Sequence, residues 1–250
     1  MIIPQYIFII PYRNRKEHIF FFKKYTSYLL EDYEKDSYRL LFVNQHDNLP
    51  FNRGAMKNMG FKYIKKIYPD SYKSIILIFN DVDTLPHKKG LLNYNVNFGE
   101  IKHFYGYTFA LGGIFSIRAG DFEKINGFPN YWNWGFEDNI LNNRALNHNL
   151  KINRNQFYKI QSMEILHFLD EYQKLMDENI VDKLSNSNYI EKDGLNYLSN
   201  YKYEFNIQEN MLYIHSFNSL YSHKDIIPYY HNIKNGGKVM NKKKKQMIFT

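Results

Sequence analysis

An apolar run ends in two carboxylates one residue apart at Ser74-Ile75-Ile76-Leu77-Ile78-Phe79-Asn80-Asp81-Val82-Asp83. The run favours a buried strand, and the two acidic side chains point the same way from an extended backbone. In open α/β sheets, ligands bind beyond the carboxyl ends of the strands. Oxygen ligands at that place favour Mg²⁺ or Mn²⁺, with a diphosphate bound through the ion. The alternative is that Asn and Asp only end the strand and open a turn.

Composition restricts the class of protein. The chain has 250 residues, 44% of them hydrophobic, which is enough for one large core or two small ones. Cysteine is absent, which excludes disulfides and thiolate sites and suits a reducing compartment. The apolar stretch at residues 6–10 is too short for a membrane span or a signal sequence. We therefore expect a globular protein without a transmembrane segment.

The net charge of +8 is concentrated near the C-terminus. Residues 222–250 hold seven lysines against one aspartate, a net charge of +6, which leaves +2 for residues 1–221. A nearly neutral body argues against nucleic acid as a partner. We expect one folded domain at residues 1–221 and a basic, flexible C-terminal tail at residues 222–250.

Strand and helix patterns alternate along the first third of the chain. We expect strands at residues 6–10 and 39–43 and before Asp81, separated by helices at residues 16–30 and 55–68. This order predicts an α/β fold with a parallel, Rossmann-like central sheet and helices on both faces.

A polar cluster follows each of these strands, so we expect the three clusters to meet at one rim of the sheet. Arginine side chains bind phosphate and stack on bases, which lysine does poorly. Two arginine clusters beside a metal site therefore suit a nucleotide diphosphate, whereas ordinary surface charge is the alternative. The clusters are Arg13-Asn14-Arg15, Phe51-Asn52-Arg53 and Asp81-Val82-Asp83.

A second set of functional candidates lies in the middle of the chain. Gly112-Gly113 is followed by an aromatic loop ending in Trp134-Gly135-Phe136-Glu137-Asp138, at the start of an amphipathic segment. An acid there could act on a sugar stacked against an indole. Alternatively, the two acids cap a helix, whose amides and dipole favour negative charge. Both roles can hold together, although the helix end lowers a carboxyl pKa and the desolvation that helps a general base raises it.

These motifs together resemble the β-1,4-galactosyltransferases, glycosyltransferase family seven. Seven blocks occur in the family's order and cover about residues 6 to 216. They are Ile9-Ile10-Pro11-Tyr12-Arg13-Asn14-Arg15, Phe51-Asn52-Arg53, Asp81-Val82-Asp83, Gly112-Gly113, Asn126-Gly127-Phe128-Pro129-Asn130, Trp134-Gly135-Phe136-Glu137-Asp138 and Asp193-Gly194-Leu195-Asn196.

The resemblance implies a GT-A type fold and a metal-dependent, inverting transfer of a sugar from a UDP-sugar to a glycan or glycoconjugate acceptor. It implies that Asp138 is the general base, that Glu137 helps to bind the acceptor, and that Asp83 ligates Mn²⁺. Trp134 would sit on a mobile loop that closes over the donor, and Asp81 would contact the ribose or the sugar. The implied donor-binding residues are Pro11, Arg13, Arg15, Phe51, Arg53, Asp81, Val82, Gly113 and Trp134.

The chain departs from the family's pattern at several places. The membrane anchor and stem are missing, which leads us to expect a cytoplasmic, soluble enzyme from a virus or microbe with an AT-rich genome. Phe136 replaces a glycine, which should reshape the acceptor pocket. The family's metal site is completed by a histidine and a methionine three residues before it. Here these places are held by His167 and Glu164, and a carboxylate in place of a thioether should make the site more tolerant of Mg²⁺.

The donor pocket also differs. A tyrosine that crowds the donor sugar at C2 in the galactosyl enzymes is replaced by Ala110, so we expect an N-acetylhexosamine such as GalNAc to be accepted at least as well as galactose. Tyr107 or Phe109 could swing into the vacancy. A non-catalytic sugar-nucleotide or glycan-binding protein of the same fold is the alternative function, although such a protein would be expected to have lost Asp83 or Asp138.

Overall fold

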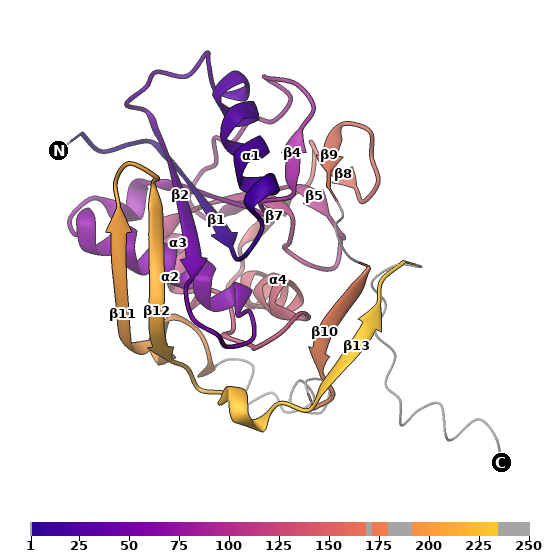
Figure 1. Ribbon diagram of the computed structural model, residues 1–250. Coiled ribbons are helices and arrows are strands. Elements are labelled where there is room, and N and C mark those ends of the chain that lie inside the picture. The colour runs from indigo at the N-terminus through magenta and orange to yellow at the C-terminus, as the bar shows by residue number, and fades with distance from the viewer. Residues whose placement is uncertain (1, 169–171, 180–191, 235–250) are drawn as a thin grey trace.

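The computed structural model describes residues 2–168, 172–179 and 192–234. Its main feature is a central sheet to which nine strands belong (Figure 1). They are β1 (Tyr6–Tyr12), β2 (Tyr38–Gln45), β3 (Ile76–Asn80), β5 (Glu100–Gly106), β6 (Ile114–Arg118), β7 (Lys151–Asn153), β8 (Tyr158–Lys159), β11 (Ser199–Asn206) and β12 (Met211–Asn218). The order across the sheet is β11-β12-β2-β1-β3-β6-β5-β7, with β8 also paired to β5.

The sheet is mixed, so the expectation of a parallel sheet holds for only part of it. Strands β12, β2, β1 and β3 run parallel, as the alternation of strands and helices predicted for the first three strands along the chain. In contrast, β6 is antiparallel to both β3 and β5, and β11 is antiparallel to β12. Strands β5 and β6 are joined by a short loop at residues 107–113, and so short a connection can join only antiparallel neighbours.

Helices cover both faces of the sheet, as the sequence predicted. Because successive side chains of a strand point to opposite faces, Phe8 and Ile10 belong to one core and Ile7 and Ile9 to the other. The core with Phe8 includes α1, and the core with Ile7 includes the other three helices. The helices are α1 (Lys16–Leu29), α2 (Arg53–Ile67), α3 (Ala119–Lys124) and α4 (Glu137–Asn147), with short 3₁₀ turns at η1 (Tyr72–Ser74), η2 (Leu195–Tyr197) and η3 (His223–Asp225).

Strand β1 continues two residues beyond the expected end at residue 10. Pro11 pairs in register with Val43 of β2, whereas the pairing of β1 with β3 stops at Ile9 and Phe79. Proline has no backbone N–H to donate, and here it stands where β1 has a partner on only one side. The loop at this rim therefore begins two residues later than the sequence indicated, and Arg13 is its first residue.

Two small two-stranded sheets flank the carboxyl ends of the central strands. Strand β4 (Thr84–Pro86) pairs with β9 (Ile165–His167), and β10 (Gln173–Asp177) pairs with β13 (Pro228–Asn232). In Figure 1, the β10–β13 ribbon lies on the opposite side of the view from β11 and β12. Residues 222–234, which the sequence analysis placed in the basic tail, thus contain η3 and β13. The lysine run at residues 242–245 lies outside the described residues. Among the described residues, no helix is long and apolar enough to cross a membrane.

Candidate functional site

The three polar clusters that follow β1, β2 and β3 do meet at one rim of the sheet. They line a single hollow of about 180 Å³. Its lining residues are Pro11, Arg13, Asn14, Arg15, Phe51, Arg53, Asp81, Val82 and Asp83. The hollow therefore brings together, from three separate chain segments, most of the residues implied for nucleotide binding.

A second cleft of about 230 Å³ continues from this hollow, because Arg53, Asp81 and Asp83 line both. The two acids at the start of α4 and the glycine pair before β6 also line this cleft. Predicted site residues lining this cleft are Arg53, Asp81, Asp83, Ala110, Gly113, Trp134, Glu137, Asp138 and His167. The cleft thus joins the expected nucleotide rim to the expected chemical centre.

The start of α2 is fixed by its capping residue. The side chain of Asn52 accepts a hydrogen bond from the Ala55 amide at 2.9 Å, which satisfies one of the free amides of the first helical turn. The same side chain donates to the Asn130 carbonyl oxygen at 2.9 Å. Arg53 therefore begins the helix in a fixed position, with its guanidinium 5.8 Å from the Phe51 ring centroid.

Two basic residues of α2 face the two acids of α4. Arg53 pairs with Glu137 at 3.1 Å, and Lys57, one turn further along α2, lies 3.3 Å from Asp138 Oδ1. Lys57 Nζ also lies 3.6 Å from Asp81 Oδ1. Residues four apart share one face of a helix, so a single face of α2 holds both acids.

Burial shifts the ionisation of these groups. Burial raises the pKa of Asp138 to about 7, and the charges of Glu137 and Asp81 add to the rise while Lys57 opposes it. The pKa of Asp81 is lowered, because Lys57, Arg53 and further cations outweigh its burial. Glu137 and Asp138 lie in the first turn of α4, where the helix dipole favours negative charge, but the N-cap residue is Phe136 and no side chain of the described residues caps the helix. For Asp138, desolvation raises the pKa by more than the start of the helix would lower it.

The glycine pair in the loop between β5 and β6 allows close contacts, and Gly112 leaves room for the Asp138 side chain. A Cβ atom at Gly112 would lie 2.4 Å from Asp138 Oδ2, far inside contact distance. Gly113 has φ +69°, and a Cβ there would lie 2.4 Å from the Tyr105 carbonyl oxygen. The Leu111 amide also donates to the Asp138 carbonyl oxygen at 2.9 Å. The absence of a side chain at Gly112 lets this loop approach α4, and the absence of one at Gly113 lets it approach Tyr105 of β5.

Two of the other motif blocks support the site without lining it. Asn130 donates its backbone and side-chain N–H groups to the carboxylate of Asp193, at 2.6 and 2.7 Å. Burial raises the pKa of Asp193 to about 6, against the opposing hydrogen bonds from Asn130. Arg144 of α4 donates to the Gly127 carbonyl oxygen at 2.6 Å and also to the Asp193 carbonyl oxygen. These contacts fix the loop that leads to the Glu137–Asp138 pair.

Trp134 lies against the β10–β13 ribbon. Its amide donates to the Leu175 carbonyl oxygen at 2.8 Å, and its ring is parallel to that of His231, with centroids 6.3 Å apart. Phe136, at the place of the family's glycine, has φ +68°, a left-handed conformation that glycine adopts more easily. Its side chain packs with Tyr131, Ile140 and Met176 and lines the cleft, so this departure does change the cleft wall.

Asp83 and His167 are brought together by the β4–β9 pairing. Thr84 is in register with His167, and the Phe168 amide donates to the Asp83 carbonyl oxygen at 2.9 Å. A 2.8 Å hydrogen bond joins the Tyr105 hydroxyl to His167 Nδ1, which orients the ring and leaves Nε2 as the nitrogen available to a metal. Within the described part of the chain, no three His, Asp or Glu side chains form a metal cage. The pair instead fits a cation with few protein ligands that completes its shell with diphosphate oxygens.

Glu164 does not join this pair. Its carboxylate accepts a hydrogen bond from the Ser162 hydroxyl, and it is absent from the lining of both the hollow and the cleft. The Glu164 carbonyl oxygen accepts a hydrogen bond from the His87 amide at 2.9 Å, which extends the β4–β9 pairing past residue 165. We therefore remove Glu164 from the proposed metal site.

The arginines of the first cluster are partly engaged within the protein. Arg13 donates to the carbonyl oxygens of Leu49 and Asp47, so it holds the loop after β2 as well as lining the hollow. Arg15 forms an ion pair with Asp83, 2.7 Å from Oδ2. A cation at Asp83 would compete with Arg15 for the Asp83 carboxylate.

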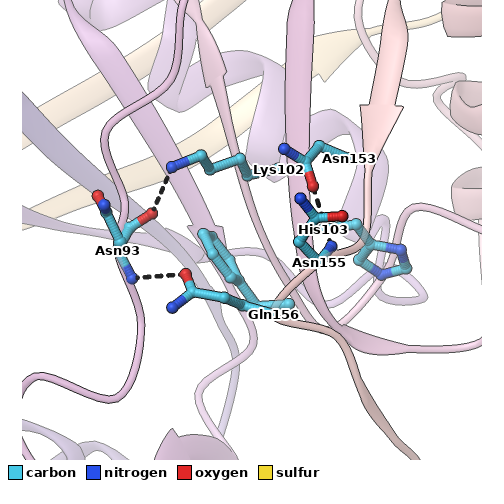
Figure 2. A pocket seen from close by; sticks show the side chains of 7 residues that line it. Asn93, Lys102, His103, Asn153, Asn155 and Gln156 are labelled. Carbon is cyan, nitrogen blue, oxygen red and sulfur yellow. Dashed lines mark hydrogen bonds between the residues drawn. The ribbon is translucent and has the colours of Figure 1, made fainter.

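Another pocket, of about 190 Å³, lies near β5 and β7 (Figure 2). Its polar groups are largely paired with each other: Lys102 donates to the Asn93 carbonyl oxygen, and the Asn93 amide donates to the Gln156 side chain. None of the carboxylates discussed above lines it. We place no part of the candidate site there.

Three residues that line the cleft or contact its lining residues were not predicted from the sequence: Lys57, Tyr105 and His231. Lys57 falls within the helix predicted at residues 55–68, and its spacing of four residues from Arg53 is a signal that it shares a helix face with that arginine. Tyr105 lies inside an apolar stretch, and His231 lies in the segment that the sequence predicts to be a basic tail. No pattern in the sequence indicated that β13 would pair with β10 beside Trp134.

Solved structures share this fold. The catalytic domain of Drosophila β1,4-galactosyltransferase 7 in complex with xylobiose matches with a TM-score of 0.68 and 22% identity, over 90% of this chain and 98% of that one. A mutant of that enzyme in complex with manganese, UDP-Gal and xylobiose matches with a TM-score of 0.67 and 21% identity. The fold is thus the mixed α/β, GT-A type fold of these galactosyltransferases.

Sequence comparison gives the family. The N-terminal region of glycosyl transferase group 7 matches residues 4–95, and the model described as the N-terminal domain of galactosyltransferase matches residues 93–168. Together the two models cover more than half of the chain. The chain belongs to the group 7 galactosyltransferase family.

Individual relatives match over part of their length. The xylosylprotein 4-beta-galactosyltransferase of Caenorhabditis elegans is 32% identical over 155 residues, which is 58% of this chain and 52% of that protein. Human beta-1,4-galactosyltransferase 5 is 29% identical over 221 residues, or 82% of this chain and 53% of that protein. The chain spans about half the length of these relatives.

Proposed function

We propose that this protein transfers a hexose or N-acetylhexosamine from a UDP-sugar to a hydroxyl of a carbohydrate acceptor, with inversion at the anomeric carbon. The observation that carries the proposal is the convergence of three post-strand clusters and the Glu137–Asp138 pair on one connected cleft. Membership of the group 7 family supports it. The acids implied for chemistry, Asp83 and Asp138, are both present, which disfavours a non-catalytic binding protein.

The hollow is suited to the nucleotide. Pro11, Val82 and the Phe51 ring give it an apolar wall, and Arg13, Arg15 and Arg53 supply cationic groups. Arginine side chains can form two parallel hydrogen bonds with a phosphate. The UDP part of the donor would lie in the hollow, and its sugar would reach the cleft that Asp81 and Gly113 line.

Asp138 has the properties of the base. Its side chain is 23% exposed in the cleft, and its pKa of about 7 lets it accept a proton near neutral pH. It would take the proton of the acceptor hydroxyl, whose oxygen forms the new bond as the bond to UDP breaks. Glu137, held by Arg53, is placed beside it to orient the acceptor.

Asp83 and His167 would hold the divalent cation, Mn²⁺ in our proposal, with Mg²⁺ tolerated. When bound, such an ion supplies positive charge that stabilises the departing diphosphate. Arg15 and Arg53 line the same hollow and would neutralise part of the remaining charge. The absence of cysteine supports a cytoplasmic location as part of the proposal.

A donor and acceptor screen tests the function. Purified protein is incubated with Mn²⁺ and each of UDP-Gal, UDP-GalNAc, UDP-GlcNAc and UDP-Glc, and both hydrolysis and transfer are scored. Xylosides are included among the acceptors because the C. elegans relative is named for xylosylprotein and the Drosophila structures contain xylobiose. We expect transfer from UDP-Gal or UDP-GalNAc. UDP-sugar binding without turnover of any donor would favour the non-catalytic alternative.

The pH dependence of turnover follows from Asp138. The base must be ionised, and its pKa is about 7, so kcat should rise as the pH increases through 7 and fall about tenfold per unit well below it. The measurement is kcat between pH 5 and pH 9 at saturating donor, with thermal unfolding followed over the same range. A flat profile down to pH 5 would argue against Asp138 as the base.

The identity of the cation gives another expectation. Asp83 and His167 include no thioether, so activity should be supported by Mn²⁺ and, to a lesser degree, by Mg²⁺. His167→Ala should weaken the apparent affinity for Mn²⁺ by roughly 10-fold or more, whereas Glu164→Gln should leave it unchanged. The measurement is activity as a function of Mn²⁺ and Mg²⁺ concentration for the wild type, His167→Ala and Glu164→Gln. Full activity of His167→Ala at low Mn²⁺ would exclude the histidine.

Donor selectivity depends on Ala110 in our proposal. Ala110 lines the cleft, and Tyr107 and Phe109 stack on each other with centroids 5.2 Å apart. Because a steric gate excludes the larger ligand, Ala110→Tyr should reduce transfer from UDP-GalNAc much more than from UDP-Gal. The ratio of kcat/KM for the two donors is the measurement, and each donor serves as the other's control. Equal losses, or a wild type that uses only UDP-Gal, would refute the gate.

A further inference from the structure

Lys57 is a buried cation placed between two cleft carboxylates. Its side chain is 1% exposed, and Nζ lies 3.3 Å from Asp138 Oδ1 and 3.6 Å from Asp81 Oδ1. The third neighbour is the Phe128 ring, whose centroid is 4.6 Å from Nζ. Burying an ammonium group is costly unless it is paired, so the two carboxylates determine where this charge sits.

The surrounding charges explain why a cation is needed. The groups that act on Asp138 are Arg53 and Lys57 on α2, Asp81 after β3, and Glu137 on α4. Glu137 already forms an ion pair with Arg53 at 3.1 Å. Without Lys57, Asp138 and Asp81 would be neighbouring carboxylates with no cation between them, and such pairs retain a proton.

We propose that Lys57 is a positioning residue that keeps Asp138 ionised and fixes its Oδ1, so that the carboxylate can act as the base beside Asp81. This inference rests on the proposed function of Asp138. Two contacts define the orientation: Oδ1 lies against Lys57 Nζ, and Oδ2 lies next to Gly112, where a Cβ would approach to 2.4 Å. The shift of Lys57 itself agrees, because the carboxylates of Asp138 and Asp81 raise its pKa despite burial.

The first test is a titration that needs no activity. Aspartate Cγ signals of ¹³C-labelled, metal-free protein are followed with pH, and the Asp138 signal is assigned by its loss in Asp138→Asn. In Lys57→Met, which keeps the length and removes the charge, the Asp138 midpoint should rise by about 1 to 3 pH units. Lys57→Arg should restore it to near the wild-type value. An unchanged midpoint in Lys57→Met, or failure of arginine to restore it, would overturn the proposal.

The matched control lies on the same helix. Lys65 of α2 pairs with Glu123 and has a side chain that is 48% exposed. Lys65→Met should leave both the Asp138 midpoint and the pH profile of kcat as in the wild type. Lys57→Met should move the acid limb of that profile upward by the same amount as the titration, whereas a merely structural role would lower the melting temperature without moving the limb.

A reciprocal measurement covers the case in which Lys57→Met does not fold. The ¹⁵Nζ signal of Lys57 is titrated in the wild type and in Asp138→Asn, and loss of the carboxylate should lower the Lys57 midpoint. An equal midpoint in both proteins would contradict the coupling. If the shifts occur but no UDP-sugar is turned over, the proposed function fails and the charge coupling stands. If sugar is transferred without any shift, the inference fails alone.

Discussion

Asp138→Asn is expected to lower kcat by a factor of about 10² to 10⁴ while leaving UDP-sugar binding nearly unchanged. The amide has almost the same shape as the carboxylate, but it cannot take the proton of the acceptor hydroxyl. Asp138 lines the cleft and not the hollow proposed for the nucleotide, which is why binding should persist. Donor binding by calorimetry and turnover at saturating donor separate the two effects.

The same variant should lose the dependence of kcat on pH near 7, because the group responsible has been removed. Lys57 then keeps only Asp81 as a close carboxylate partner, so thermal unfolding must be followed alongside activity. An Asp138→Asn protein with near-normal turnover would remove the role of base from this residue.

Asp83→Asn is expected to have the second large effect. Asp83 supplies the only carboxylate of the proposed two-residue metal site, and an amide oxygen binds Mn²⁺ far less strongly. Loss of charge stabilisation at the leaving diphosphate should lower kcat/KM for the donor by about 10³ or more, since a metal ion contributes several kcal/mol to the transition state. The measurement pairs Mn²⁺ binding in the presence of UDP with steady-state turnover.

The matched control for this variant is Asp36→Asn. Asp36 has a side chain that is 64% exposed, and within the described part of the chain it forms an ion pair only with Arg39, so its loss should change neither quantity. Because Asp83→Asn also removes the carboxylate that forms an ion pair with Arg15, the melting temperature should be compared with that of wild type. Undiminished Mn²⁺ binding by Asp83→Asn would place the cation elsewhere.

Much of the fold could be predicted because the signals are local. The apolar run before Asp81 and the alternation of strands and helices around it gave β1 to β3 and the helices on both faces. The mixed direction of the sheet could not be predicted in this way. It depends on whether the chain returns through a short loop, as at residues 107–113, and no helical pattern or periodicity marks that choice.

The candidate site was predictable wherever its residues directly follow strands. The carboxyl ends of β1, β2 and β3 had to meet at one rim, and the three clusters do line one hollow. Contacts between elements were not predictable from spacing. Lys57 reaches Asp138 across 81 positions of sequence, and His231 reaches Trp134 through the pairing of β10 with β13. Glu164 lies outside both the hollow and the cleft, and its carboxylate accepts a hydrogen bond from Ser162, two residues earlier.

The most direct test of the proposed transfer is the configuration of the first product. With an α-linked UDP-sugar, Mn²⁺ and whichever acceptor the screen identifies, the anomeric proton of the product is followed by NMR during the first turnovers. Water serves as the acceptor if no other is found, and the released sugar is then observed before mutarotation. A base that activates the acceptor for a single displacement gives a β-linked product in the wild type and almost none in Asp138→Asn. An α-linked product, or equal rates in the two proteins, would contradict it.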